Sequence, residues 1–217
     1  IIDTDRNRLE ERLRAYFGAK TFRAAAKVAE DIAKKRARYD PEDAWSKLKA
    51  AGHFKSKAIV PFLTVPFDRR YIYYVASQKW LNEARPEFAR NASNNEWLVT
   101  VPEPRKVSET WPVYASDLVN LHVHERGSVV FPRETRGEGL LSDRDANLPE
   151  ATWRVLRGHF GLKGERRDDD ARDLVGKLFR AALAVLHAPS YQAEHKSALS
   201  ADWAHLPIPK DIALFER

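Results

Sequence analysis

The sequence predicts an α+β fold in which N-terminal and C-terminal helices flank a central, twisted and mainly antiparallel β-sheet. Residues 1–57 carry apolar side chains at helical spacing, and the same spacing returns over residues 150–217. Residues 58–149 instead hold short β-prone runs separated by Pro and polar residues. A chain of 217 residues can bury a core of its own. We therefore expect one domain made of a helical entry, a β-rich middle and a helical closure.

The N-terminal part reads as three helices. Residues 4–37 are expected to form two of them, separated by Gly18, because apolar residues recur on one stripe of each. A short third helix is expected near Asp40, since Pro41 suits a first-turn position. Gly52 is expected to end it.

The middle part reads as strands, because β-branched and aromatic residues gather in short runs. A polar segment, RNASNNE, separates two of these runs and is expected to be a loop. The predicted strands are residues 59–65, 71–76, 96–102 and 118–125.

Helices return after Pro149, and the strongest helical pattern covers residues 171–187, where Leu174 and Leu178 fall on one face. Pro189 is expected to end that helix, and Ser190 to cap the next.

Composition points to a folded protein with a polyanionic partner. Hydrophobic residues make up 43% of the chain and aromatic residues 11%, and no apolar run is long enough to predict a transmembrane helix. The net charge of +6 and the pI near 9.5 are compatible with a nucleic acid. The absence of Cys excludes disulfides and thiolate zinc sites and favours an intracellular setting. The absence of Met and of a signal-peptide pattern suggests a fragment of a larger protein.

The run VPFDRRYIYY places two adjacent guanidiniums in an aromatic, β-prone segment. Strand alternation sends Arg69 and Tyr73 to one face and Arg70 and Tyr74 to the other. Arginine forks suit phosphates and guanine edges, and tyrosine rings can stack on bases. The alternative is an amphipathic strand whose aromatic rings fill the core while Asp68 pairs with one arginine.

Other loops also carry side chains suited to nucleic acid. Asn can bond adenine bidentately and Arg can do so to guanine, although Asn in a loop is also ordinary turn chemistry. The candidate base-reading residues of the RNASNNE segment are Arg90, Asn91, Asn94 and Asn95. The further candidates for phosphate contact are Arg105, Lys106, Arg126, Arg133 and Arg136.

A metal site is not expected. His122 and His124 would share one face of a strand with Arg126, but zinc needs more ligands and the cation opposes it. Structural or phosphate-facing histidines are the better interpretation. The acidic run at residues 168–170 precedes a predicted helix, where the helix dipole favours negative charge, so helix capping is preferred to a metal site there.

Several segments together resemble the C-terminal specificity domain of Type ISP restriction-modification enzymes. The run VPFDRRYIYY is similar to the PFDxRxxYY element of that family, and RPEF, LHVHERGSVVFP, VLHAPSY and LPIPKD follow in the family's order. The resemblance spans nearly the whole chain. Because enzymes with different targets share the PFDxRxxYY frame, it implies that Arg69, Tyr73 and Tyr74 are frame or backbone contacts, with base reading in the loops between motifs.

The resemblance implies sequence-specific recognition of double-stranded DNA, which positions the duplex for an adenine methyltransferase and a nuclease. The chain lacks the FxGxG and NPPY elements of such a methyltransferase, the GxxxxGK[ST] phosphate loop and nuclease or hydrolase motifs. No cofactor is therefore expected in this fragment. S-adenosylmethionine, ATP and Mg²⁺ are expected only in other domains of a parent enzyme in the cytoplasm of a bacterium or archaeon. The alternative is a structural or coupling module that packs against the methyltransferase or motor domains.

Overall fold

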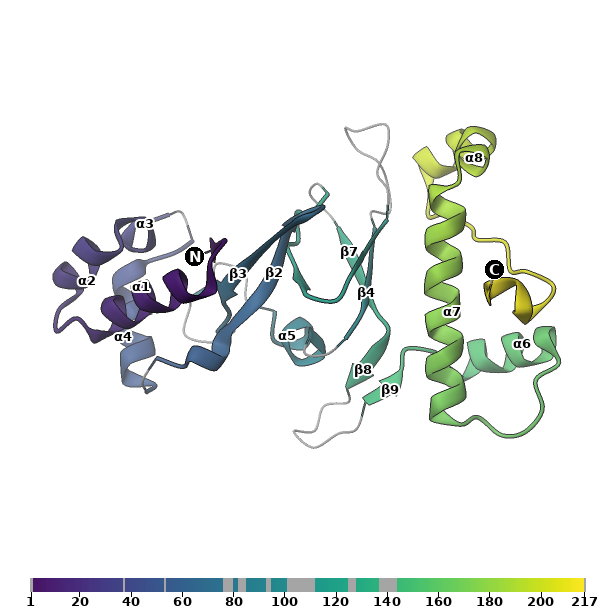
Figure 1. The fold of residues 1–217 in the computed structure, drawn as a ribbon, viewed down its shortest axis with the longest axis horizontal. Helices are drawn as coiled ribbons and strands as arrows, with labels where there is room; N and C mark the ends of the chain where they lie inside the picture. Colours follow the sequence, from purple (N-terminus) through teal and green to yellow (C-terminus); the bar gives the residue numbers. More distant parts are fainter. Residues whose placement is uncertain are drawn as a thin grey trace. The chain divides into compact units, whose positions relative to one another are not determined.

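The computed structural model contains two compact units (Figure 1). Unit 1 comprises Ile1–Ala92 and Asp117–Asn120, and unit 2 comprises Ser93–Ser116 and Leu121–Arg217. The chain that was expected to form a single domain is thus divided into two units. The structure describes residues 2–36, 38–52, 54–75, 80–81, 85–92, 95–100, 112–124, 128–136 and 144–216.

Unit 1 begins with a helical layer that the sequence predicts well. Asp5 and Asp40 cap α1 and α4 by accepting main-chain N–H bonds, and Pro41 occupies the first turn of α4 as expected. Gly52 follows α4 with a φ of 128°, a conformation that glycine adopts without strain. The helices of the layer are α1 (Arg6–Gly18), α2 (Phe22–Val28), α3 (Glu30–Ala33) and α4 (Pro41–Ala50), followed by the short 3₁₀ turn η1 (Ser56–Ala58).

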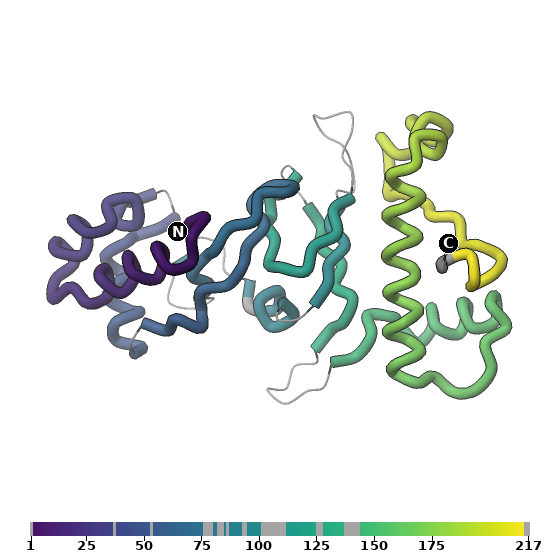
Figure 2. The backbone as a smooth tube through the Cα atoms, viewed as in Figure 1, coloured from purple at the N-terminus to yellow at the C-terminus, as the bar shows by residue number. Residues whose placement is uncertain are grey.

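The sheet of unit 1 has the strand order β1-β3-β2-β6. Its central pair is an antiparallel hairpin, visible as two adjacent runs in Figure 2, while β2 pairs with β6 in parallel. The strands are β1 (Ile2–Asp3), β2 (Ile59–Val65), β3 (Asp68–Tyr73) and β6 (Leu118–Val119).

Core residues lie on both faces of this sheet, which is why β2 reads as a nearly continuous apolar run. Ile59 and Tyr73 face the helical layer, in one core with Leu9 and Leu13. Phe62 belongs to a second core on the other face, with Ile72 and Leu118. The predicted alternation of side chains along β3 is therefore confirmed.

The helices of unit 1 differ from the prediction in two places. The second helix expected within residues 4–37 is divided at Ala29 into α2 and α3. Helix α5 (Pro86–Ala92) covers the start of the segment expected to be the RNASNNE loop, so Arg90 and Asn91 lie on a helix. Phe88 packs against the second core of the sheet. Burial of one apolar ring here outweighs the weak helix propensity of the polar residues that follow.

Within the described residues, unit 2 contains two smaller sheets, so the β-rich middle contributes to three sheets rather than to one central sheet. Strands β5 (Val113–Ala115), β4 (Trp97–Thr100) and β7 (Val129–Pro132) pair antiparallel in that order, and β8 (Glu134–Arg136) pairs with β9 (Arg144–Ala146).

The expected strand over residues 118–125 is wrong beyond Val119. Residues 121–124 are turns and bends, so His122 and His124 do not share a strand face. Val123 is buried although it lies outside any strand. The prediction failed because a short apolar pattern shows that a segment is buried but not whether a partner strand is available.

The helices of unit 2 are α6 (Glu150–Phe160), α7 (Asp168–His187) and α8 (Pro189–Ala201), with a final 3₁₀ turn η2 (Ile212–Glu216). The acidic run forms the first turn of α7, where the helix dipole favours it, but the cap residue Arg167 makes no side-chain cap bond. Pro189 opens α8 in its first turn, which corrects the expected cap at Ser190.

Taken together, the elements confirm the predicted α+β class. Within the parts of the chain that the structure describes, no helix has the length and apolar content needed to cross a membrane.

Candidate nucleic-acid interface

The β2–β3 hairpin carries the arginine pair singled out by sequence. Val65 pairs with Asp68, so Pro66 and Phe67 alone form the turn. The Thr64 hydroxyl donates to the Asp68 carboxylate at 2.7 Å and lies 3.0 Å from the Asp68 carbonyl oxygen. These contacts brace the turn from within the hairpin.

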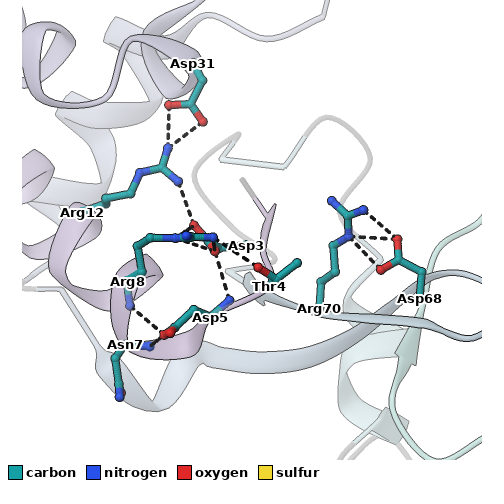
Figure 3. Close-up of polar contacts among 9 residues, drawn as sticks. All are labelled: Asp3, Thr4, Asp5, Asn7, Arg8, Arg12, Asp31, Asp68 and Arg70. Atoms are coloured by element: carbon teal, nitrogen blue, oxygen red, sulfur yellow. Dashed lines mark hydrogen bonds and ion pairs between the residues drawn. The ribbon is translucent and has the colours of Figure 1, made fainter.

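Arg70 forms an ion pair with Asp68 at the base of this turn (Figure 3). Its Nε donates to both carboxylate oxygens, at 3.0 and 2.9 Å, and its Nη2 lies 2.8 Å from Oδ2. The bond from Arg70, and then the bond from Thr64, lowers the pKa of Asp68. The Arg70 side chain is 42% exposed, so its guanidinium is oriented yet accessible. The expected pairing of Asp68 with one arginine is therefore observed.

Arg69 points to the other face of β3 and pairs with Asp117, which directly precedes β6. Its Nη2 donates to Asp117 Oδ1 at 3.3 Å, and Nε contacts the second oxygen. The side chain remains 58% exposed. The two arginines are therefore held in defined directions by different carboxylates, one of them distant in sequence.

The two tyrosines of the motif serve the fold of unit 1. Tyr73 is 3% exposed, packs against Trp80 and Phe54, and accepts a bond from the Lys55 main chain at 3.3 Å. Tyr74 donates to the Arg85 carbonyl oxygen at 3.2 Å. Both side chains are therefore engaged within unit 1.

A buried carboxylate that the sequence did not reveal lies on β1, the edge strand of the same sheet. Asp3 is 6% exposed, and the guanidiniums of Arg8 and Arg12 both donate to it (Figure 3). Arg12 also pairs with Asp31 at 2.6 Å. The bond from Arg8 is the main reason that the pKa of Asp3 falls from 3.8 to about 2, although burial opposes the shift. This network ties β1 to the helical layer.

Acid is expected to loosen unit 1 through Asp3. Because the folded-state pKa lies below the unfolded one, the stabilisation by this carboxylate is complete above about pH 4 and is lost as the pH falls toward about 2. Asp3→Asn should lower protection of α1 amides in hydrogen exchange at neutral pH and flatten its acid dependence. The exposed carboxylate of Asp169 gives a control, since Asp169→Asn should leave α1 unchanged. A wild-type acid profile in Asp3→Asn would contradict this assignment.

The candidate base-reading segment is divided between the two units. Arg90 and Asn91 lie on α5 in unit 1, where the Asn91 amide donates to the Glu87 carbonyl oxygen at 3.0 Å. Asn95 belongs to unit 2, and Asn94 lies outside the described residues.

Asn95 is 4% exposed, and its amide is fully engaged by the main chain. Its Nδ2 donates to the Glu134 carbonyl oxygen at 2.7 Å, while its Oδ1 accepts from the N–H groups of Glu134 and Glu96, at 3.1 and 2.9 Å. The side chain thereby mimics a pair of main-chain groups beside the point where β7 ends and β8 begins. Base reading by Asn95 would require these bonds to break.

Arg133 and Arg136 border the same region of unit 2. Arg133 pairs with Glu96 at 2.6 Å, and its guanidinium lies against α7, where a Cβ at Gly176 would come within 3.3 Å of it. Arg136 is exposed on β8. Tyr114 also contacts Glu96, and burial, followed by the bond to Glu96, raises the pKa of Tyr114 to about 12. Arg105, Lys106 and Arg126 lie outside the described residues.

The two histidines do not form a ligand pair in this geometry. His124 lies 3.4 Å from the Val99 carbonyl oxygen and its pKa is lowered by burial, whereas His122 is exposed. Among the described residues, no group of three His, Cys, Asp or Glu side chains is placed to hold a metal.

Comparison with known proteins identifies one family over the whole chain. The model of the Type ISP C-terminal specificity domain matches residues 1–217. No curated protein matches the sequence.

Solved structures of similar fold include three complexes with DNA or a DNA mimic. One is the DrdV–DNA complex, with a TM-score of 0.66, 15% identity and 99% of this chain covered. Another is the Type ISP enzyme LlaBIII bound to DNA, with a TM-score of 0.58, 14% identity and 99% of this chain covered. The third is a nuclease-deletion mutant of the Type ISP enzyme LlaGI in complex with a DNA substrate mimic. Its TM-score is 0.59, its identity is 16%, and 100% of this chain is covered. This chain spans only 20%, 14% and 19% of those chains, respectively.

Proposed function

We propose, because this chain belongs to the family of Type ISP C-terminal specificity domains, that it is the sequence-specific DNA-recognition module of a restriction-modification enzyme. The observation that carries the proposal is the family match over residues 1–217. Structures of similar fold come from complexes with DNA or a DNA mimic, and the net charge of +6 suits a polyanion.

In this proposal the chain binds and orients the duplex, and the chemistry belongs to other parts of a longer protein. Specificity domains of this family would hold double-stranded DNA so that an adenine methyltransferase can extrude its target base and a nuclease can act. The sites for S-adenosylmethionine, ATP and Mg²⁺ would accordingly lie outside this chain. Its own contribution is geometric and electrostatic.

The β2–β3 hairpin supports a frame role for the arginine pair. Asp68 holds Arg70 on one face of β3, and Asp117 holds Arg69 on the other. A carboxylate partner fixes the direction of each guanidinium and leaves donors for a phosphate oxygen. The two arginine side chains are 58% and 42% exposed, although their carboxylate partners are only 18% and 32% exposed, so each guanidinium can reach a phosphate without leaving its partner.

Salt-dependent binding of a duplex by this chain tests the proposal, and Arg70→Ala sharpens the test. If Arg70 holds a phosphate, the variant should bind all duplexes more weakly and reduce the slope of log affinity against log salt by about one. Competition against a randomised duplex pool should show the same sequence preference as wild type.

Arg154→Ala is the matched control for this experiment. Arg154 is also an exposed arginine in a carboxylate pair, 75% exposed beside Glu150, so the variant removes one equal charge from unit 2. An equal flattening of the slope by both variants would mean that net charge, not a contact at Arg70, sets the affinity.

A structural or coupling module is the second candidate function. The observation that favours it is the internal neutralisation of the motif, in which both arginines pair with carboxylates and Tyr73 is buried. Such a module would show no salt-dependent affinity for duplex DNA.

A further inference from the structure

The turn of the β2–β3 hairpin exposes an aromatic ring completely. Phe67 is 103% exposed, which exceeds every other large hydrophobic side chain that the structure describes. Its φ is 67°, in the left-handed region, where a bulky side chain is a steric outlier. A turn with Pro at its second residue normally carries Gly or Asn at the third, where Phe67 stands. The chain therefore places a bulky aromatic residue at a strained and solvated position.

The surrounding hairpin holds Phe67 in this conformation. Pro66 limits the backbone before it, and Asp68 after it is fixed by Thr64 and Arg70. The exposure of the ring shows that none of the described residues of unit 1 covers it and offsets its strain. Strain that the fold maintains without an internal contact is typical of residues that act on a ligand.

The charges beside the ring indicate what that ligand is. Arg69 and Arg70 are 58% and 42% exposed and leave β3 on opposite faces. A dry protein pocket that received Phe67 would have to desolvate these neighbouring charges, which is costly. Duplex DNA instead offers phosphates to guanidiniums and a base stack to an apolar ring.

We propose that Phe67 is a wedge that inserts into the base stack of bound duplex DNA, while Arg69 and Arg70 contact phosphates on either side. This inference rests on the proposed function, since it assigns a contact within the DNA-bound hairpin. The wedge carries no sequence information by itself. It places and distorts the duplex, and the fixed turn explains why the ring can be inserted without reordering the hairpin.

The test uses this chain, a randomised duplex pool and the variants Phe67→Gly and Phe67→Asn, which both suit the left-handed conformation. The variants should melt at the wild-type temperature or above, because strain is relieved. Their affinity should nevertheless fall about tenfold, the loss typical of one stacked base. In a pool with 2-aminopurine replacing some adenines, wild type should raise the fluorescence by unstacking and the variants should not.

Two further variants serve as controls. Phe67→Trp keeps a large apolar ring and should retain both affinity and the fluorescence rise. Val28→Ala removes another exposed apolar side chain of unit 1, 48% exposed, and should bind as wild type.

The outcomes separate the wedge from the broader proposal. If the wild-type chain shows no salt-dependent binding of duplex DNA, both the wedge and the proposed DNA-recognition function are overturned. Salt-dependent binding by wild type, with equal affinity or equal fluorescence rise in Phe67→Gly, overturns the wedge alone and leaves DNA recognition standing.

Discussion

Replacing Leu174 by aspartate is expected to unfold unit 2. Leu174 is 2% exposed on α7 and packs in one core with Trp153 and Leu156 of α6 and with Leu148. Burying it contributes about 1.5–3 kcal/mol, and aspartate would add an unpaired charge to the same place. A loss of about 4 kcal/mol or more is a large part of the usual stability of a domain. Thermal unfolding followed by circular dichroism should show that the cooperative transition of unit 2 has disappeared.

Two substitutions on the same helix calibrate this result. Ala184 is exposed, so Ala184→Asp adds the same charge without entering the core and should keep the transition. Leu178 is only partly buried against the core, and Leu178→Asp should therefore destabilise less than Leu174→Asp. If Leu174→Asp melts like Ala184→Asp, this face of α7 does not form the core of unit 2.

Replacing Asn95 by aspartate is expected to destabilise unit 2 strongly rather than to alter sequence preference. The change is nearly isosteric, but it sets a carboxylate oxygen against the Glu134 carbonyl oxygen that Nδ2 now contacts at 2.7 Å. A lost buried bond together with an unsatisfied carbonyl costs about 3 kcal/mol, and the buried charge adds to that cost. Chemical denaturation should show a lower midpoint for Asn95→Asp, with the denaturant slope of wild type.

Asn91→Asp makes the same chemical change on α5, where the amide donates to the Glu87 carbonyl oxygen at 3.0 Å and the side chain is not fully buried. It should alter stability by less than about 0.5 kcal/mol, as surface changes usually do. If the predicted segment reads bases, Asn91→Asp should change which duplex is preferred, with roughly 1–3 kcal/mol for each lost bidentate contact. If Asn95→Asp is as stable as wild type, the main-chain bonds of Asn95 do not stabilise unit 2, and Asn95 remains a candidate base-reading residue.

Elements with a strong periodic pattern were predictable from sequence alone. Strand β2 covers the predicted residues 59–65, and α7 contains all of residues 171–187. In both segments the apolar residues recur along the sequence with the period of the secondary structure, so the buried side could be predicted without knowing which segments pack against it.

Weak patterns failed where a distant segment supplied the partner. The run at residues 118–125 contributes only β6, because β2 offers a parallel edge to Leu118 and Val119 alone. Helix α5 forms where Phe88 finds the sheet of unit 1, although the sequence there reads as a polar loop. In both cases long-range packing decided a conformation that local propensity left undetermined.

The roles of the candidate residues divide along the same line. Residue type alone indicated which side chains could meet a phosphate or a base, and the order of motifs indicated the family. Only the tertiary structure showed that Arg69 pairs with Asp117, that Asn95 completes a main-chain network, and that Phe67 stands exposed on a strained turn. The physical reason is that chemistry and periodicity are local properties of the chain. A partner, a buried site or an exposed tip exists only once distant segments have packed together.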